Sequence, residues 1–401
     1  MTAPSVELLP HHGLAALGGE PHVFHCHHYN CFLQKAVLDQ GALVDAPELL
    51  TAPAAEVALT QLRTLGATRQ QAEELFRVLG FGRVDLSGVG RGGGTARLSG
   101  SHYALGWLSK FGRASQPVCF MPAGWVEGVA RHLHGAAFTA REVECVAAGG
   151  KECRIEVTPG GPERAASPGL GTLSKFGARP PAALATSVDE ASIIAACAGL
   201  PLGGDAEGTV HAFGVSLTRH YANYYNLLSY RFDAAMASAA GEAAQTAARM
   251  LLVEAGRVCA FHTFGGIMES AEWEALVKPQ CRTREDWLYG MVAAVNALGW
   301  GRWSVAQVRP GQRIEMVVDG SYESNGHLAA FGKSDGPRCF LVTGGVAGLA
   351  NLLYNADITE RPDLTPAFYA QTFQRPGFFV AREVECRSQG AAACRVVAER
   401  L

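Results

Sequence analysis

Two stretches of the chain carry the same short pattern of cysteine and glutamate. The six letters AREVEC begin at residue 140 and again at residue 381, and in both places a second cysteine follows the first after seven residues. Each copy also has an earlier cysteine, so the repeated residues are Cys119, Glu142, Cys145 and Cys153, and then Cys339, Glu383, Cys386 and Cys394. Three thiolates and one carboxylate suit a zinc ion with a closed, structural coordination shell. We therefore expect two structural zinc sites, one in each half of the chain.

Spacing alone leaves two other interpretations of these cysteines open. Unpaired cysteines are often buried as small apolar side chains, although the recurrence of all three in both copies argues against that role. A disulfide is the second alternative. The N-terminus has neither the basic region nor the apolar core of a signal peptide, so we expect a reducing, cytoplasmic environment in which disulfides are rare.

The stretch HVFHCHHYNCF at residues 22–32 gathers four histidines and two cysteines. If a helix begins here, His25 and His28 share one face with a residue one turn further on. Two imidazoles and a cysteine suit an additional iron or copper ion, or zinc. A Cys26 thiolate activated by histidine is instead a candidate nucleophile. A polar, partly buried first helix at a domain interface is the simplest alternative, and the three interpretations stay open. The candidate catalytic residues are His25, Cys26 and His28.

The second half of the chain contains a related stretch, SLTRHYANYYNLLSY at residues 216–230, which keeps a His-Tyr pair but has no cysteine. The two halves therefore differ here while they share the metal motif, as expected for one scaffold with two distinct pockets. Histidines and aromatic residues around these stretches are candidates for a pocket wall, although aromatic residues are more often plain core. The candidates are Cys31, His102, Trp125, His220, Tyr221, Tyr224 and His327.

The similarity extends well beyond these motifs, which makes the chain a tandem repeat. At a constant offset of 220 residues, identical residues coincide, among them Ser101 with Ser321 and Cys119 with Cys339. The second copy then gains 21 residues before AREVEC returns. A Pro-, Gly- and Ala-rich stretch between the copies indicates a linker. We expect an N-terminal tail at 1–19, a first repeat at 20–158, a linker at 159–189 and a second repeat at 190–401.

Hydrophobic spacing predicts the same kind of fold in both repeats. Apolar residues at three-to-four spacing predict helices early in each repeat, at 31–40, 55–66, 242–256 and 285–299. Short alternating runs predict strands later, at 82–89, 154–159, 302–308, 313–320 and 394–399. The stretch GVGRGGG at 88–94 has dinucleotide-type glycine spacing but precedes no helix, so we interpret it as a hairpin loop. The order of elements predicts an α+β fold, with an antiparallel sheet and packed helices in each repeat. We expect the two repeats to pack as an intrachain pseudo-dimer.

The segments QPVCFM and REVEC, followed by a glycine-rich loop and CRI, resemble the 4-vinyl-reductase-type ligand-binding domain. They are most similar to the aromatic-effector-sensing domain of phenol- and xylene-responsive bacterial activators. The segment GSYESNGHLAAFG of the second repeat resembles the part of that domain before its first cysteine. The resemblance implies a zinc ion held by three cysteines and a glutamate beside a pocket for a small aromatic molecule. It selects Glu142 and Glu383 over Glu144 and Glu385, because the ligand of that family lies three residues before the cysteine.

The chain also departs from those activators. The Gly-Lys-Ser of FGKSDG lacks the preceding glycine of a phosphate-binding loop, and no basic helix pair follows the last motif. The net charge of −3 does not indicate a nucleic-acid surface, and no apolar run is long enough to cross a membrane. We therefore expect a zinc-stabilised binding or sensing protein for a small hydrophobic or aromatic molecule, with no DNA-binding or ATPase domain of its own. A homodimer or a separate partner protein is compatible with this role. The alternative is a metal- or Cys/His-dependent enzyme, acting through redox or ring chemistry, with its centre at His25, Cys26 and His28.

Overall fold

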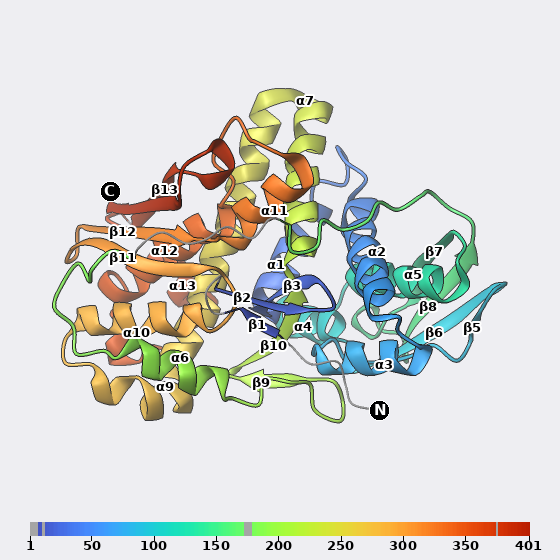
Figure 1. Cartoon of the computed structure of the whole chain (residues 1–401), viewed down its shortest axis with the longest axis horizontal. Coiled ribbons are helices and arrows are strands. Elements are labelled where there is room, and N and C mark those ends of the chain that lie inside the picture. The colour runs from blue at the N-terminus through green and yellow to red at the C-terminus, as the bar shows by residue number, and fades with distance from the viewer. Residues whose placement is uncertain (1–6, 10–12, 172–178, 374–375) are drawn as a thin grey trace.

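The computed structural model describes residues 7–9, 13–171, 179–373 and 376–401, and its strands form three antiparallel sheets (Figure 1). Two of the sheets have the same architecture, one in each repeat. The first runs β4 (Arg83–Asp85), β6 (Gly93–Ser99), β8 (Cys153–Pro159) and β7 (Phe138–Glu144), with β5 (Val89–Gly90) paired to β6. The second runs β11 (Arg302–Arg309), β12 (Arg313–Asp319), β14 (Cys394–Arg400) and β13 (Phe379–Glu385). The α+β prediction with antiparallel sheets is confirmed, and the tandem arrangement fits these two sheets.

The third sheet joins the two repeats. Its order is β1 (Glu7–Leu9), β2 (Leu14–Leu17), β3 (Glu20–Cys26), β10 (Val215–Tyr221) and β9 (Val210–Ala212). In Figure 1 this sheet lies between the first repeat, on the right, and the second repeat, on the left. Residues 7–9 and 14–17 are therefore strands, which corrects the expected N-terminal tail over these residues. Their backbone groups pair with the next strand, β1 with β2 and β2 with β3, so this part of the chain is fixed.

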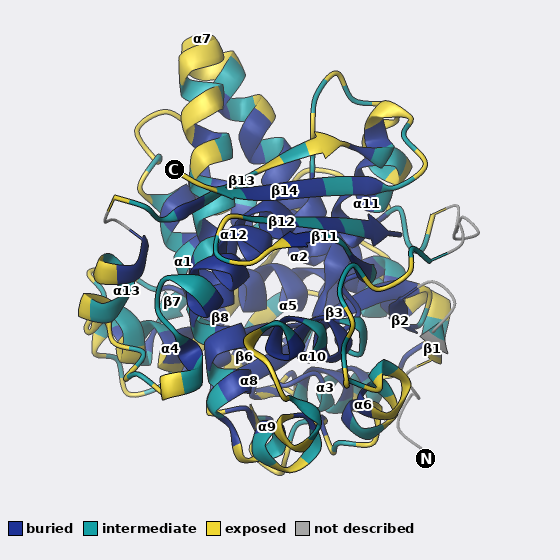
Figure 2. Cartoon of the chain, turned by 90° about the vertical axis from the view of Figure 1, so that its left-hand side faces the viewer, coloured by how far each residue is buried: buried dark blue, intermediate teal, exposed yellow. Residues whose placement is uncertain are grey.

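Each repeat covers its sheet with helices. The first repeat has α1 (His27–Leu38), α2 (Ala46–Leu65), α3 (Arg69–Val78), α4 (His102–Phe111) and α5 (Phe120–His134). The second has α6 (Glu190–Ala198), α7 (Ala222–Cys259), α8 (Gly265–Glu269), α9 (Ala271–Leu276), α10 (Arg284–Asn296), α11 (Tyr322–Phe331), α12 (Phe340–Tyr354) and α13 (Pro366–Phe373). Non-helical angles at Ala240 and Gly241 divide α7 into two arms that lie side by side in Figure 1. Figure 2 shows α12 and the inner strands β12 and β14 as largely buried.

The predicted helix over the histidine-cysteine stretch begins later than we expected. Residues 20–26 form β3, and α1 starts only at His27. The Cys26 side chain caps α1 by accepting a hydrogen bond from the Tyr29 backbone N–H over 3.5 Å. The strand forms because every residue of β3 is buried and β10 supplies its hydrogen-bonding partner. The shared helical face of His25 and His28 is therefore wrong, because only His28 is helical.

Glycines let the central helix of each repeat approach its neighbour closely. A Cβ on Gly124 of α5 would lie 2.1 Å from the Thr51 carbonyl oxygen of α2. A Cβ on Gly344 of α12 would lie 2.1 Å from the Val253 carbonyl oxygen of α7. The same relation in both repeats shows that the paired glycines bring two helix backbones into contact.

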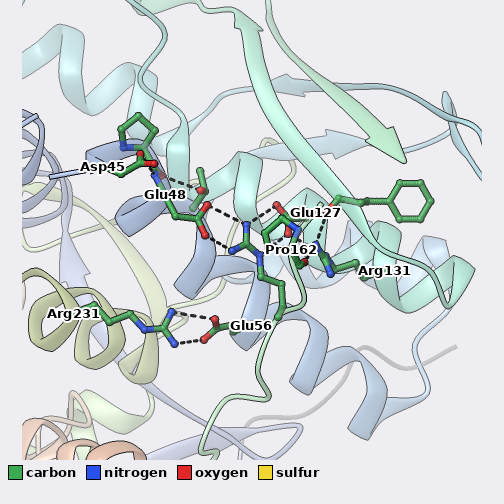
Figure 3. Close-up of polar contacts among 11 residues, drawn as sticks. Asp45, Glu48, Glu56, Glu127, Arg131, Pro162 and Arg231 are labelled. Atoms are coloured by element: carbon green, nitrogen blue, oxygen red, sulfur yellow. Dashed lines mark hydrogen bonds and ion pairs between the residues drawn. The ribbon is translucent and has the colours of Figure 1, made fainter. Parts of the chain in front are cut away.

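The described part of the linker, 160–171 and 179–189, contains no helix or strand. Arg164 nevertheless anchors it, since its guanidinium pairs with both Glu48 and Glu127, the two carboxylates near the centre of Figure 3. The GVGRGGG stretch is a hairpin, as predicted, with Gly90 opposite Gly93. Among the described residues, no helix is long and apolar enough to cross a membrane.

Candidate metal centres and ligand cavities

The first repeat gathers Cys119, Glu142, Cys145 and Cys153 into one buried group. Their candidate ligand atoms all lie within 4.8 Å of one another. The Cys153 sulfur is 3.9 Å from the Cys119 sulfur and 3.8 Å from the Cys145 sulfur. Cys119 precedes α5, Glu142 lies in β7, and Cys153 begins β8. One helix start and two adjacent strands therefore supply all four side chains.

The second repeat builds the same group from Cys339, Glu383, Cys386 and Cys394, again within 4.8 Å. The sulfurs of Cys339 and Cys394 are 3.4 Å apart. A serine hydroxyl lies against the first cysteine in both places, with Ser101 3.1 Å from Cys119 and Ser321 3.3 Å from Cys339. In the part of the chain that the structure describes, these are the only two groups of three or more such side chains that could hold a metal ion.

A strand irregularity explains how the glutamate and the second cysteine reach the same group. In a regular strand, residues three apart point to opposite faces. The pairing of β7 with β8 shifts register between Glu142 and Glu144, and β13 with β14 shifts between Glu383 and Glu385. Such a bulge re-aims the side chains on either side of it. It lets Glu142 and Cys145 enter one group despite their odd spacing.

The four residues fit a metal ion, because each group contains an unused ligand atom. Glu142 accepts a hydrogen bond from the Cys119 N–H through Oε2 over 2.7 Å, and its buried Oε1 has no partner. Glu383 repeats this, with Oε2 accepting from the Cys339 N–H over 2.9 Å and Oε1 without a partner. A buried carboxylate oxygen without a partner costs free energy unless a cation or donor meets it. One oxygen of each carboxylate is thus oriented by the protein while the other is free to ligate.

The electrostatics of each group favour a cation as well. Burial, and then the charge of Cys145, raises the pKa of Glu142 to about 7. The same causes, with Cys386 as the neighbour, raise the pKa of Glu383 to about 8. Hydrogen bonds from Cys119 and Cys153 lower the pKa of the Cys145 thiol, which favours its thiolate. A thiolate beside a buried carboxylate is a concentration of negative charge that a bound metal cation would stabilise.

The three candidate catalytic residues do not form one centre. His25 is fully buried in β3, where its ring packs against Tyr29 and Trp300, and its Nε2 has no partner. Cys26 is also fully buried and accepts a hydrogen bond from the Thr263 hydroxyl over 2.9 Å.

His28 instead stacks on His262, with ring centres 3.7 Å apart. It lines a surface cavity that His25 and Cys26 do not reach. The strand-to-helix boundary at residues 26 and 27 is what separates the three side chains.

Most of the pocket candidates lie in a packed core between the repeats. Tyr221 accepts a hydrogen bond from the Trp125 indole over 2.9 Å, and the Tyr103 hydroxyl lies 2.9 Å from His220 Nε2. His102 Nε2 lies 3.0 Å from the Asn30 amide nitrogen. The remaining candidates are Cys31 and Tyr224, which are buried, and His327, which lies against Gly332 and Phe331 in α11. None of the seven lines the cavities described below.

Comparison with known proteins bears on the first group. Residues 107–159, which contain Cys119, Glu142, Cys145 and Cys153, match the family model of the vinyl-4-reductase domain. This segment is a vinyl-4-reductase domain. The resemblance seen in the sequence is therefore confirmed here.

A solved structure of the phenol-responsive sensory domain of the transcription activator PoxR, with phenol, is 23% identical. Its match covers 36% of this chain and 80% of that chain, with a TM-score of 0.32. A vinyl-4-reductase family protein from Methanocaldococcus jannaschii is 20% identical, with 27% and 68% covered and a TM-score of 0.23. These scores are too low to support a conclusion about function. The search of curated proteins found no match.

One cavity opens directly beside the metal group of the vinyl-4-reductase domain. It has a volume of about 590 Å³ and is lined by Cys119, Glu142, Phe120 and Glu48, among others. A second cavity, of about 730 Å³, lies between the repeats and includes His28 and His262 in its wall. Volumes of this size are typical of small-molecule sites.

Several residues of these sites carried no usable signal in the sequence. His262 is the clearest case, because its partner His28 lies more than 200 residues earlier in the chain. Thr263 contacts Cys26, and Gln61 accepts a hydrogen bond from the Tyr221 hydroxyl. Only the repeat itself, which places both stretches near the domain interface, could have indicated such pairs.

Proposed function

We propose that the chain is a zinc-stabilised protein of two vinyl-4-reductase-type repeats that binds, and thereby senses, a small hydrophobic or aromatic molecule. The observation that carries this proposal is the recurrence of one buried Cys3Glu group in both repeats, the first of them inside the segment that matches the family model. Zinc is the metal that three thiolates and a carboxylate suit best, and a closed site of this kind contributes folding free energy. The two ions hold the ends of β7 and β8, and of β13 and β14, against the helices α5 and α12.

The two repeats act as an intrachain pseudo-dimer in this proposal. β3 and β10 each precede the first helix of their repeat and pair antiparallel. Phe24 and Arg219, each the fifth residue of its strand, lie opposite one another. A twofold axis between two equivalent strands requires such a pairing of equivalent residues. Arg231 of α7 and Glu56 of α2 add a two-pronged ion pair between the repeats, at 3.0 and 2.7 Å (Figure 3).

The alternative of an enzyme centred on His25, Cys26 and His28 has less support. His25 and Cys26 are fully buried and line none of the described cavities, so a substrate has no path to them. Binding requires only the features that the repeats provide.

Equilibrium dialysis of the zinc-loaded chain tests the proposed function, with toluene, phenol and 2-naphthol as probes. We expect saturable binding of at least one probe, with no more than two molecules per chain. Absence of saturable binding by all three would contradict the proposal.

A further inference from the structure

The cavity between the repeats, which we name the inter-repeat cavity, is built from both halves of the chain. The first repeat supplies His28 and Phe32 of α1 and Lys110 of α4. The second repeat supplies the β9–β10 turn, the segment around His262 and the residues that precede and begin α13. A site with this composition cannot form within either repeat alone.

Three departures from regular backbone form the second-repeat wall of this cavity. Ala260–Phe264 is a π-helix, a rare form found mostly at functional sites, and it places His262 in the wall. Phe213 has a φ of +55° in the tight turn between β9 and β10, which is unfavourable for a bulky residue. The extra residues of the second repeat carry Leu364 and Tyr369 into the wall.

Backbone strain is confined to this same region. In the described ranges, the only non-glycine residues with positive φ are Phe213, Asp357 and Arg361. The last two flank the short turn Ile358–Glu360 that leads to Leu364. Residues held in unfavourable conformations gather at ligand sites, where the surrounding structure stabilises them. Strain of three residues beside one cavity therefore points to a binding role.

The two repeats differ most where they meet at this cavity. The strands β3 and β10 correspond, so the residues that follow them, His28 and Asn223, occupy equivalent positions. The insertion that carries Leu364 and Tyr369 has no counterpart in the first repeat. Each repeat thus contributes features that the other lacks, and these features meet in one place.

The polar groups in the wall define the chemistry of a ligand. The rings of His28 and His262 are stacked, with an interplanar angle of 10°, and the buried Nδ1 of His28 has no hydrogen-bond partner. Burial lowers the pKa of His262 to about 3 and also lowers the pKa of His28, so both imidazoles are neutral N–H donors near pH 7. Lys110 makes no ion pair with a carboxylate of the described residues, and its Nζ lies 5.7 Å from the Phe111 ring centre.

We propose that the inter-repeat cavity binds a small aromatic molecule that carries a carboxylate. Lys110 and the stacked His28 and His262 receive the carboxylate, and Phe32 and Phe213 pack on the ring. An unpaired lysine in an apolar wall gains a charge-assisted hydrogen bond when an anion enters. This inference rests on the proposed function and names the place and the class of its ligand.

Glu269 is the one carboxylate in the wall, and it belongs to a different part of the cavity. The charges that act on Glu269 are those of Arg361 and Asp363. Those that act on Lys110 are the thiols of Cys26 and Cys31. The anion site at Lys110 is therefore separate from Glu269, which accepts a hydrogen bond from a hydroxyl or amine at the other end of the ligand.

Fluorescence titration of the zinc-loaded chain with 2-naphthoate and 2-naphthol tests this inference, because the two probes share one ring system. We expect 2-naphthoate to bind about tenfold more tightly than 2-naphthol at pH 7. Lys110→Met should weaken 2-naphthoate binding by about tenfold and leave 2-naphthol binding unchanged. His262→Phe keeps the ring stack but removes the donor, and should weaken 2-naphthoate binding by about fivefold.

The matched control is Lys35→Met, since Lys35 lies on the exposed face of α1 and pairs with Asp39. It should leave the binding of both probes unchanged. Equal binding of the two probes with no effect of Lys110→Met would overturn this inference while the proposed function stands. Failure of both probes to bind would overturn it as well, and the dialysis with toluene and phenol then decides the proposed function separately.

Discussion

The hydroxyl of Tyr221 in the second repeat donates a hydrogen bond to Oε1 of Gln61 in the first repeat over 2.7 Å. It also accepts one from the Trp125 indole N–H over 2.9 Å. All three side chains are fully buried. The two repeats are thus joined by a hydrogen-bonded chain in the core as well as by the shared sheet.

Tyr221→Phe removes both of these hydrogen bonds and leaves a buried indole N–H and a buried amide oxygen without partners. We expect the free energy of unfolding to fall by about 2–4 kcal/mol. Urea denaturation measures the change. Tyr354→Phe is the control, because the Tyr354 hydroxyl is only half-buried and donates to Glu285, and its loss should cost less than about 1 kcal/mol. Equal effects of the two variants would show that the inter-repeat chain adds nothing.

Gly344→Ala tests the close approach of α12 to α7. A Cβ there would lie 2.1 Å from the Val253 carbonyl oxygen, so the helices must move apart, at a cost of about 1–3 kcal/mol. The neighbouring Gly345 is the matched control, since a Cβ there meets Trp303 at an ordinary 3.5 Å. Thermal unfolding should show a lower Tm for Gly344→Ala than for Gly345→Ala. Equal Tm values would contradict the packing role of the repeated glycines.

Glu20 makes the stability of the protein depend on pH. Burial raises its pKa to about 7, partly offset by hydrogen bonds with Ser167 and Asn223. The folded chain therefore holds a proton that the unfolded chain releases above its ordinary pKa of 4.5, and the stability that this provides is lost as pH rises toward 7. The loss amounts to at most about 3 kcal/mol.

Glu20→Gln removes this titration. We expect the variant to match the original chain at pH 4 and to be more stable at pH 8, as measured by urea midpoints at both pH values. A variant that is less stable than the original chain at pH 8 would contradict the raised pKa.

Cys386→Ser should release one metal ion and destabilise the second repeat. A structural metal supplies much of the local folding free energy, so we expect a loss of more than about 3 kcal/mol. Cys281→Ser is the control, because Cys281 is half-buried and belongs to neither metal group. Unchanged metal content and stability in Cys386→Ser would remove the second site from the account.

The sequence predicts the parts of the fold that recur within it. Cys119 and Cys339, with the AREVEC motifs, identify both metal groups because the same residues occur twice at corresponding positions. The repeated glycines likewise predict the close helix contacts. Local patterns fail where a partner distant in the sequence decides the structure.

Residues 20–26 illustrate such a failure, because they become a strand only by pairing with residues 215–221. His262 is another example. It reaches His28 because of a π-helix, and no periodicity in the sequence marks a single wide turn.

Metal content per chain tests the central claim most directly. Mass spectrometric metal analysis of protein purified without a metal-binding tag should find two zinc ions per chain, one for each Cys3Glu group. Fewer than one metal ion per chain, in protein that is folded, would contradict the account of the repeated motif.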